Sequence, residues 1–467
     1  MATSSQDLTY IQAKEILNKN SYEVAFAHKK LRHVVPSREY YIHQWKWDSA
    51  VHAMGLLHLD ETWAFDEIIS LLSGQWQNGF IGHITFNPEE EKYFPGPKYW
   101  GTHTKSTNGI LSSGITQPPL ITLSVLYLYK HAKNKKKADI FIREVLPAIT
   151  KYHEYLKKYR DPENCGLVSV LHPWESGADN SPRWDSLLQR INIKDIPKEV
   201  KVLVDTYRVD HKTGTMSDRP SNDDYYRYMH LIFLYKKANW DYSEIVKETP
   251  FAVKDILFNS IWCRANEALA EIYTLLDKKR EAKLYEEYAT QTKIALQNSW
   301  DEQTCLFTDI DVTQGRWLAI KENTNATFGP LFAGAVTKQQ MPKLLAKIVD
   351  PMQYWTDCPV PTTSFNNKKF ELTRYWRGPT MPMTNFLIIE GLSRYKKDIQ
   401  CLNIRDALIQ KTIQMIEKYS FYEYYDPLSD KNSFNVIRSG RGFGTFSWTA
   451  AIYIYLCHEY PHIINSQ

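Results

Sequence analysis

Apolar residues recur at helical spacing along most of this 467-residue chain, and this periodicity restricts the fold more than any other feature. In the clearest segment, 255–277, one face of the expected helix carries Ile261, Ala265, Leu269, Ile272 and Leu276. The other segments of this kind are 9–19, 38–57, 60–73, 119–133, 138–158, 222–238, 279–298, 338–348, 383–394, 401–418 and 445–459. The pattern predicts about a dozen helices and an all-α protein.

The connections between these helices indicate how they are arranged. They vary in length and contain no strong Gly-, Ser- or Pro-rich linker, and strand-like pieces are short, as at 166–171. Many helices in one chain form either a solenoid or a closed ring of helical hairpins. Because no fixed-period repeat stands out in the sequence, the solenoid is disfavoured, and we expect a closed toroid.

Charge and cysteine usage exclude several classes of protein. Lys and Arg number 57 against 53 Asp and Glu, so the net charge of +4 gives no indication of a nucleic-acid partner or an acidic membrane surface. We see no secretory signal and no apolar stretch of the roughly 18 residues that a membrane span needs. The six cysteines are scattered singly. We therefore expect a cytoplasmic protein with reduced thiols, no metal and no cofactor, and the sequence leaves homo-oligomerisation open.

The stretch 172–185, HPWESGADNSPRWD, combines acids with aromatic rings. It contains Trp174, Glu175, Asp179, Trp184 and Asp185, with Gly177 allowing a sharp turn before Asp179. Indole rings stack on the apolar faces of a sugar, and by excluding water they raise the pKa of a neighbouring acid. The stretch therefore predicts a carbohydrate site. The alternative is a loop between two helices whose acids cap the second helix.

Four further loops gather aromatic, acidic, amide and Arg side chains. They are 41–48 (YIHQWKWD), the long connection 74–119, 374–385 (RYWRGPTMPMTN) and 421–427 (FYEYYDP). Binding residues concentrate on loops that a rigid scaffold holds, and a connection as long as the second is usually functional. Because Glu423 lies among four aromatic residues, it and an acid of 172–185 have the pattern of a glycosidase pair. The residues alone do not decide which of the three acids in that stretch is the partner.

The ordered set of motifs resembles glycoside hydrolase family 63, and within it the mannosylglycerate and glucosylglycerate hydrolases. The matching motifs are QWKWD (44–48), GFIGH (79–83), TQPP (116–119), HPWESGADNSPRWD (172–185), RPSNDDYYRY (219–228), YWRGP (375–379), YEYYDP (422–427) and FSWTAA (446–451). Each motif alone is weak, whereas the ordered set across nearly the whole chain is specific. One departure is Thr380-Met381, where the family commonly has Val-Trp. This departure affects the sugar or aglycone preference.

The resemblance implies a fold and a reaction. The fold is an (α/α)6 toroid forming one catalytic domain over residues 1–467, with 74–118 as a cap-like insertion. The reaction is hydrolysis of a small α-glucoside or α-mannoside of glycerate with inversion. Asp179 matches the general acid and Glu423 the general base, and neither step needs a metal. For inversion, the two carboxyl groups should lie roughly 6.5–9.5 Å apart to leave room for a water.

The resemblance also implies the binding residues. Around the sugar we expect Trp47, Asp48, His83, Gln117, Trp376 and Arg377, and Tyr375 is a further expected substrate-binding residue. Around the glycerate we expect Tyr41, Trp45, Tyr93 and Arg219. Arg219 is the residue expected to face the glycerate carboxylate. Its alternative is a surface ion pair with Asp223 or Asp224.

Two other functions compete with this one. Hydrolysis of another small α-glucoside, such as trehalose, would use the same two acids without needing Arg219. A noncatalytic carbohydrate-binding protein on the same toroid would need neither acid, so the presence of both counts against it.

Overall fold

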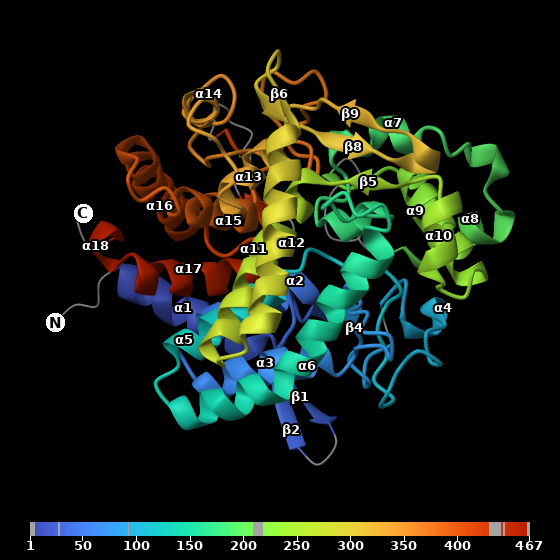
Figure 1. Cartoon of the computed structure of the whole chain (residues 1–467), viewed down its shortest axis with the longest axis horizontal. Coiled ribbons are helices and arrows are strands. Elements are labelled where there is room, and N and C mark those ends of the chain that lie inside the picture. The colour runs from blue at the N-terminus through green and yellow to red at the C-terminus, as the bar shows by residue number, and fades with distance from the viewer. Residues whose placement is uncertain are drawn as a thin grey trace.

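The computed structural model describes residues 5–26, 29–91, 93–208, 218–428, 440–441 and 444–464. Within these residues, six helices form an inner ring (Figure 1): α2 (Lys46–Leu56), α5 (Ile121–His131), α11 (Ile256–Leu275), α13 (Gly329–Phe332), α15 (Pro382–Leu392) and α17 (Ser447–Glu459). Each helix packs against the next one in this order, and α17 packs against α2, which closes the ring. The all-α toroid expected from the sequence is confirmed.

Burial explains why these helices occupy the centre. Every residue of α2 is buried, and so is every residue of α17 from Ser447 to Leu456. A helix that is covered on all sides must be apolar nearly all round or must satisfy its polar groups internally. The sequences of α15 and α17, PMTNFLIIEGL and SWTAAIYIYLCHE, have this character.

The outer helices are amphipathic and cover the inner ones. They are α1 (Ser5–Lys19) on α17, α3 (Glu61–Leu72) on α2, α6 (Lys135–Arg160) on α5, α12 (Lys279–Asn298) on α11, α16 (Ile399–Tyr419) on α15, and α14 (Met341–Ile348), which packs on α16. On α12, the buried residues recur at three- and four-residue spacing: Ala282, Tyr285, Ala289, Thr292 and Leu296. Because α1 packs against α17, helices near the two ends of the chain lie side by side (Figure 1).

Every segment with helical periodicity forms a helix, with two differences from expectation. The segment 38–57 becomes helical only at Lys46, because β3 (Gln44–Trp45) pairs with β4 (Ile84–Thr85) just before it. The inner helix α13 was not predicted, since a single turn is too short to show a period. The strand-like piece 166–171 contributes one bridge, between Val170 and Val253.

Two long connections extend the ring at one end. Residues 73–120 include β4 and α4 (Pro97–Trp100). Residues 161–255 include α7 (Asp185–Leu188), α8 (Lys198–Tyr207), α9 (Asn222–Lys237), α10 (Tyr242–Glu248) and β5 (Val253–Lys254). Together they form a second apolar cluster that contains Trp100, Trp184 and Tyr228.

The strands are short and peripheral. The antiparallel hairpin of β1 (Ser21–Phe26) and β2 (Lys29–Val34) packs on α3. A three-stranded sheet has the order β5, β8 (Asp309–Asp311), β9 (Leu318–Ile320), and β6 (Trp300–Asp301) pairs with β7 (Leu306–Phe307). In the described part of the chain, no helix is long and apolar enough to span a membrane. All six cysteines belong to this part and are free thiols.

Ring closure requires a close approach between α2 and α17, and Gly55 permits it. A Cβ atom on Gly55 would lie 2.6 Å from the carbonyl oxygen of Ala451. We expect Gly55→Ala to lower the free energy of unfolding by about 1–3 kcal/mol, because the added methyl group overpacks a backbone contact. Urea denaturation would measure the change, with Thr290→Ala on the exposed face of α12 as control. Equal stability of both variants would show that the contact is not tight.

Candidate active site

A cavity opens at the end of the ring where α2 and α17 begin. The cavity has a volume of about 980 Å³, which includes the solvent-filled space at its open mouth. The lining residues are Pro36, Tyr40, Tyr41, Trp45, Trp47, Asp48, His83, Tyr93, Phe94, Gln117, Trp174, Gly177, Asp179, Arg219, Pro220, Tyr225, Tyr375, Glu423, Phe446 and Trp448. Thus the four loops and the stretch 172–185 that the sequence singled out all contribute side chains to one cavity.

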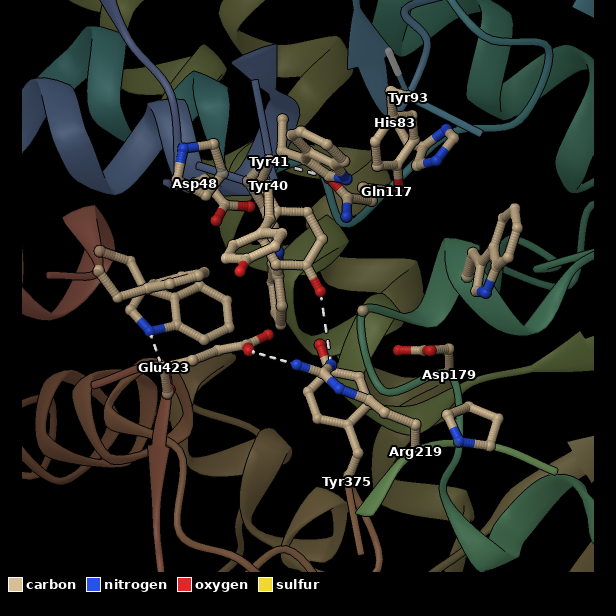
Figure 2. A pocket seen from close by; sticks show the side chains of 18 of the residues that line it. Tyr40, Tyr41, Asp48, His83, Tyr93, Gln117, Asp179, Arg219, Tyr375 and Glu423 are labelled. Atoms are coloured by element: carbon tan, nitrogen blue, oxygen red, sulfur yellow. Dashed lines mark hydrogen bonds and ion pairs between the residues drawn. The ribbon is translucent and has the colours of Figure 1, made fainter. Parts of the chain in front are cut away.

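Asp179 is held by a turn and by a helix that packs on it. The one-turn 3-10 helix Pro173–Ser176 ends at Gly177, whose φ of 75° lies in the left-handed region that favours glycine. A Cβ atom on Gly177 would lie 2.7 Å from the Trp47 ring, so the loop can approach that indole only with glycine here. The Tyr228 hydroxyl of α9 donates to the main-chain oxygen of Asp179 at 2.9 Å. The carboxyl group of Asp179 is directed into the cavity (Figure 2).

Glu423 enters the cavity from the other side. It follows α16 and directly precedes β10 (Tyr424–Tyr425), where Tyr425 pairs with Thr380 through two backbone hydrogen bonds. The Trp448 indole donates to the main-chain oxygen of Glu423 at 3.2 Å. The side chain is 1% exposed, and Arg219 donates to its Oε2 at 2.9 Å. Figure 2 shows Glu423 and Asp179 on opposite sides of the cavity.

Arg219 is a buried cation of the cavity, and it forms an ion pair with Glu423. The guanidinium also donates to the Tyr41 hydroxyl at 3.4 Å and stacks on the Tyr375 ring, with 4.5 Å from Cζ to the ring centroid. The surface alternative does not hold, because the Arg219 side chain is only 3% exposed. One of its two suggested partners, Asp224, instead pairs with Arg227.

Tyr375 lies between the two acids. Burial raises the pKa of its phenol well above the usual range, and the negative charges of Glu423 and Asp179 raise it further. The main chain of Tyr375 is fixed next to the Asp179 loop, because the Asn180 amide donates to the Tyr375 carbonyl at 2.9 Å. A neutral phenol is therefore available as a hydrogen-bond donor between the acids.

Asp48 is a third acid in the cavity and lies in the first turn of α2. It is 3% exposed, and burial raises its pKa well above the usual range, with further contributions from the charges of Glu423 and Glu67. Asp48 is thus enclosed in the wall of the cavity. The neighbouring Trp47 belongs to the core cluster and also lines the cavity, and its main-chain N–H donates to Gln117 Oε1 at 3.4 Å.

The long connection 74–119 supplies His83, Tyr93 and Gln117 to the cavity. His83 Nδ1 shares a 2.5 Å hydrogen bond with the Ser113 hydroxyl, and burial lowers the pKa of the imidazole well below its usual range. His83 is therefore neutral. The Tyr93 ring packs edge-on against Trp45, with 5.3 Å between ring centroids.

Two of the expected binding residues, Trp376 and Arg377, do not line the cavity. Trp376 is 1% exposed, and its ring packs 6.2 Å from that of Trp47. Arg377 turns away and forms a bidentate ion pair with Asp185, with distances of 2.8 and 2.9 Å. Their contacts support the loops behind the cavity. The motif YWRGP could not distinguish them from Tyr375, because side-chain direction in an irregular loop has no fixed period.

Several lining residues were not assigned from the sequence. They are Pro36, Tyr40, Phe94, Trp174, Gly177, Pro220, Tyr225, Phe446 and Trp448. Most of them belong to the motifs that were recognised, so membership of an aromatic-rich motif was the available signal. Tyr40 and Phe94 had no signal beyond the Tyr41 and Tyr93 beside them.

A buried carboxylate, Glu175, joins the loops that build the cavity. Its two oxygens accept hydrogen bonds from Arg160 at 2.7 and 2.8 Å, from the main chain of Thr116 at 3.0 Å and from the main chain of Leu171 at 2.7 Å. The Thr116 hydroxyl in turn accepts from Lys46 at 2.6 Å. The segments that carry Trp47, Gln117 and Asp179 therefore meet at one polar network.

One group of potential metal ligands occurs among the described residues, away from the cavity. It consists of Asp161, Glu163 and Cys165. Lys157 pairs with Asp161 at 2.6 Å and Lys254 with Glu163 at 3.1 Å. These two lysines already neutralise the carboxylates, so the group does not indicate a metal centre.

The Glu175 network generates a stability prediction. Glu175→Gln would leave the fully buried Arg160 guanidinium without its counter-charge, and we expect a loss of about 3–5 kcal/mol in the free energy of unfolding. Asp185→Asn is the control, because its partner Arg377 is less buried and the expected loss is about 1 kcal/mol. Urea denaturation monitored by tryptophan fluorescence compares them. Similar losses in both variants would contradict the role of Glu175.

Comparison with known proteins identifies the family. Residues 41–449 match the model of the mannosylglycerate hydrolase MGH1-like glycoside hydrolase domain. The chain is 34% identical over 446 residues to a mannosylglycerate hydrolase of Thermus thermophilus, covering 95% of this chain and 99% of that one. It is 32% identical over 432 residues to a glucosylglycerate hydrolase of Mycolicibacterium hassiacum, with coverages of 88% and 91%.

The fold agrees with a solved structure of the same group. A GH63 mannosylglycerate hydrolase from Thermus thermophilus, in complex with Tris and D-glycerate, superposes with a TM-score of 0.83 at 32% identity, covering 96% of this chain and 99% of that one. Both the sequence and the toroid therefore match over nearly the whole length. The chain belongs to the mannosylglycerate hydrolase MGH1-like group of glycoside hydrolase family 63.

Proposed function

We propose that this glycoside hydrolase cleaves a small α-glycoside in which glucose or mannose is joined to glycerate, and that it inverts the anomeric carbon. The observation that carries the proposal is the pair of acids, Asp179 and Glu423, on opposite sides of one aromatic cavity (Figure 2). Relatives named for hydrolysis of mannosylglycerate and glucosylglycerate support the substrate class.

In the proposed reaction, Asp179 is the general acid and Glu423 the general base. Asp179 gives its proton to the glycosidic oxygen as the bond from this oxygen to the anomeric carbon breaks. A water attacks that carbon from the opposite face and gives its proton to Glu423. The products are the free sugar with inverted configuration and glycerate. The ion pair with Arg219 holds the Glu423 carboxylate in place for this step.

The sugar would occupy the part of the cavity over the first turn of α2. Trp47 offers an apolar surface, and Gln117 offers an amide that can bond to hydroxyl groups. Because burial favours the protonated form of Asp48, this acid can donate a hydrogen bond to a sugar hydroxyl. Tyr375 and His83, both neutral, complete the polar contacts of this subsite.

The glycerate would lie near Arg219, Tyr41, Trp45 and Tyr93. A guanidinium has five N–H donors, so Arg219 can bind Glu423 and a carboxylate of the substrate at the same time. Residues 74–118, which supply His83, Tyr93 and Gln117, would act as a cap over the bound substrate.

We place the reaction in the cytoplasm on the basis of the free thiols.

The acid pair can be tested by removing one carboxylate at a time. We expect Asp179→Asn and Glu423→Gln each to lower kcat by about 10²–10⁴-fold, because each variant loses one proton transfer. Asp224→Asn, outside the cavity, is the control and should retain activity. Circular dichroism checks that all variants are folded. If either variant in the pair kept its activity while binding the substrate, the assignment of that residue would be wrong.

The substrate and the stereochemistry can be read in one assay. Incubation with glucosylglycerate, mannosylglycerate and trehalose, followed by proton NMR, should show release of the β-anomer from a glycerate glycoside. Release of the α-anomer would contradict the mechanism. Turnover of trehalose alone would favour the disaccharide alternative.

A substitution of Arg219 can distinguish loss of the contact with glycerate from a general loss of catalysis. We expect Arg219→Gln to lower kcat/KM for both substrate types, since it also loosens Glu423. The loss on a glycerate glycoside should exceed that on an aryl glycoside by about 10–100-fold, the range for a hydrogen bond to a charged group. Arg377→Gln is the matched control, and it should affect both substrates equally. If Arg219→Gln lowered kcat/KM equally for the glycerate glycoside and the aryl glycoside, the contact with the glycerate carboxylate would be excluded.

A further inference from the structure

A second cavity lies at the opposite end of the ring. Its volume is about 1120 Å³ counted to its mouth, comparable to that of the active-site cavity. All six inner helices line it, with Met54, Leu126, Arg264, Phe332, Phe386 and Tyr455 as examples from each. On α2, Asp48 in the first turn faces the active site, whereas Met54 near the last turn faces the second cavity. The two cavities thus open at opposite ends of one ring.

The inner wall of the second cavity is apolar and its rim is charged. Leu123, Leu126 and Phe386 are 8%, 5% and 1% exposed, so they form the closed part. The charged residues are Lys130, Arg264, Glu271, Glu390, Arg394, Lys396 and Glu459. Lys130 and Glu271 neutralise each other through a 2.7 Å ion pair across the rim. The remaining charges determine what the cavity can bind.

Two arginines that line the cavity, Arg264 and Arg394, share one carboxylate. Both arginines bind the same carboxylate, Glu267, at 3.2 and 2.8 Å, and Lys293 binds it at 3.0 Å. Glu267 is therefore the shared ion-pair partner of three cations. Glu267 itself does not line the cavity. Burial lowers the pKa of Arg264, and the charge of Arg394 lowers it further, whereas the carboxylates of Glu267 and Glu271 oppose this effect.

Two acids, Glu390 and Glu459, also line the cavity, and each accepts a hydrogen bond from a tyrosine. The Tyr460 hydroxyl donates to Glu390 at 2.9 Å, and the Tyr127 hydroxyl donates to Glu459 at 2.5 Å. Burial raises the pKa of Glu390, and the Glu459 charge adds to this effect. Glu390 and the nearby Ser393 hydroxyl can therefore exchange hydrogen bonds with the hydroxyl groups of a ligand.

We propose that the second cavity binds a small hydroxylated anion, with its carboxylate or phosphate on Arg264 and Arg394 and its hydroxyl groups toward Glu390 and Ser393. Arginine is suited to both anions, because its planar fork donates two parallel hydrogen bonds. The site is separate from the proposed hydrolysis and does not depend on it. An occupant would link Arg264 in the middle of α11 with Arg394 just after the end of α15, and both helices belong to the ring that also supports the active site.

Isothermal titration calorimetry on the full chain tests this site. Inorganic phosphate and D-glycerate are the two probes, at constant ionic strength, in a protein that carries Arg219→Gln to weaken anion binding at the other cavity. We expect one site per chain, and we expect the added change Arg264→Gln to weaken binding at least 10-fold. Arg143→Gln, on the exposed surface of α6, is the matched control and should bind like the parent.

The outcomes of the titrations distinguish between the two classes of anion and show whether the site exists. Binding of phosphate but not D-glycerate would assign the site to phosphate compounds, and the reverse would assign it to hydroxy acids. If neither probe bound, or if Arg264→Gln left the affinity unchanged, the proposal would be overturned. If Arg264→Gln failed to fold, the exposed rim change Lys396→Glu would decide, because it should weaken binding several-fold and leave the fold intact. Unchanged affinity in that variant would equally overturn the site.

Discussion

The fully buried ion pair between Glu175 and Arg160 is the constraint on which the active-site cavity depends. Two charges without water are costly unless every lone pair is used, and Glu175 meets this condition with two main-chain donors besides the guanidinium. These donors belong to Thr116 and Leu171, which lead directly to Gln117 and to the stretch that carries Asp179. The position of Asp179, the proposed general acid, relative to the loop that carries Gln117 therefore follows from one carboxylate that does not itself line the cavity.

The closed ring of inner helices explains why the molecule has two cavities with different chemistry. Helix N-termini carry partial positive charge and unsatisfied N–H groups, and the end where α2 and α17 begin holds Asp48 and Glu423. The other end has partial negative charge from the helix C-termini, and there Lys130 and Arg394 lie together with the acids Glu271, Glu390 and Glu459. The helix dipoles thus favour acids at the first end and cations at the second, and only the second cavity mixes several charges of both signs.

Arg219 shows how far a motif can be interpreted. The sequence offered either a ligand-facing arginine or a surface pair with Asp223 or Asp224. The structure excludes the surface pair, because Arg219 lines the cavity and pairs with the buried Glu423, which is 204 residues away in the chain. Such a contact has no local signal. Trp376 and Arg377 show a different limit of motif interpretation. Their motif contributes Tyr375 to the cavity, but their own side chains lie behind the cavity and contact Trp47 and Asp185.

The sequence by itself determined the long helices, the toroid and the loops that contain the candidate site residues. Apolar periodicity and ordered motifs are properties of the linear sequence, so they can be recognised without a structure. It also marked Glu423 and the three acids of 172–185, and the resemblance to the family selected Asp179 among the three. The tertiary structure alone decided that both acids line one cavity, that Asp48 is enclosed beside them, and that Tyr40, Phe446 and Trp448 complete its walls. These facts depend on how six helices close into a ring, and ring closure brings together residues that no spacing along the chain relates.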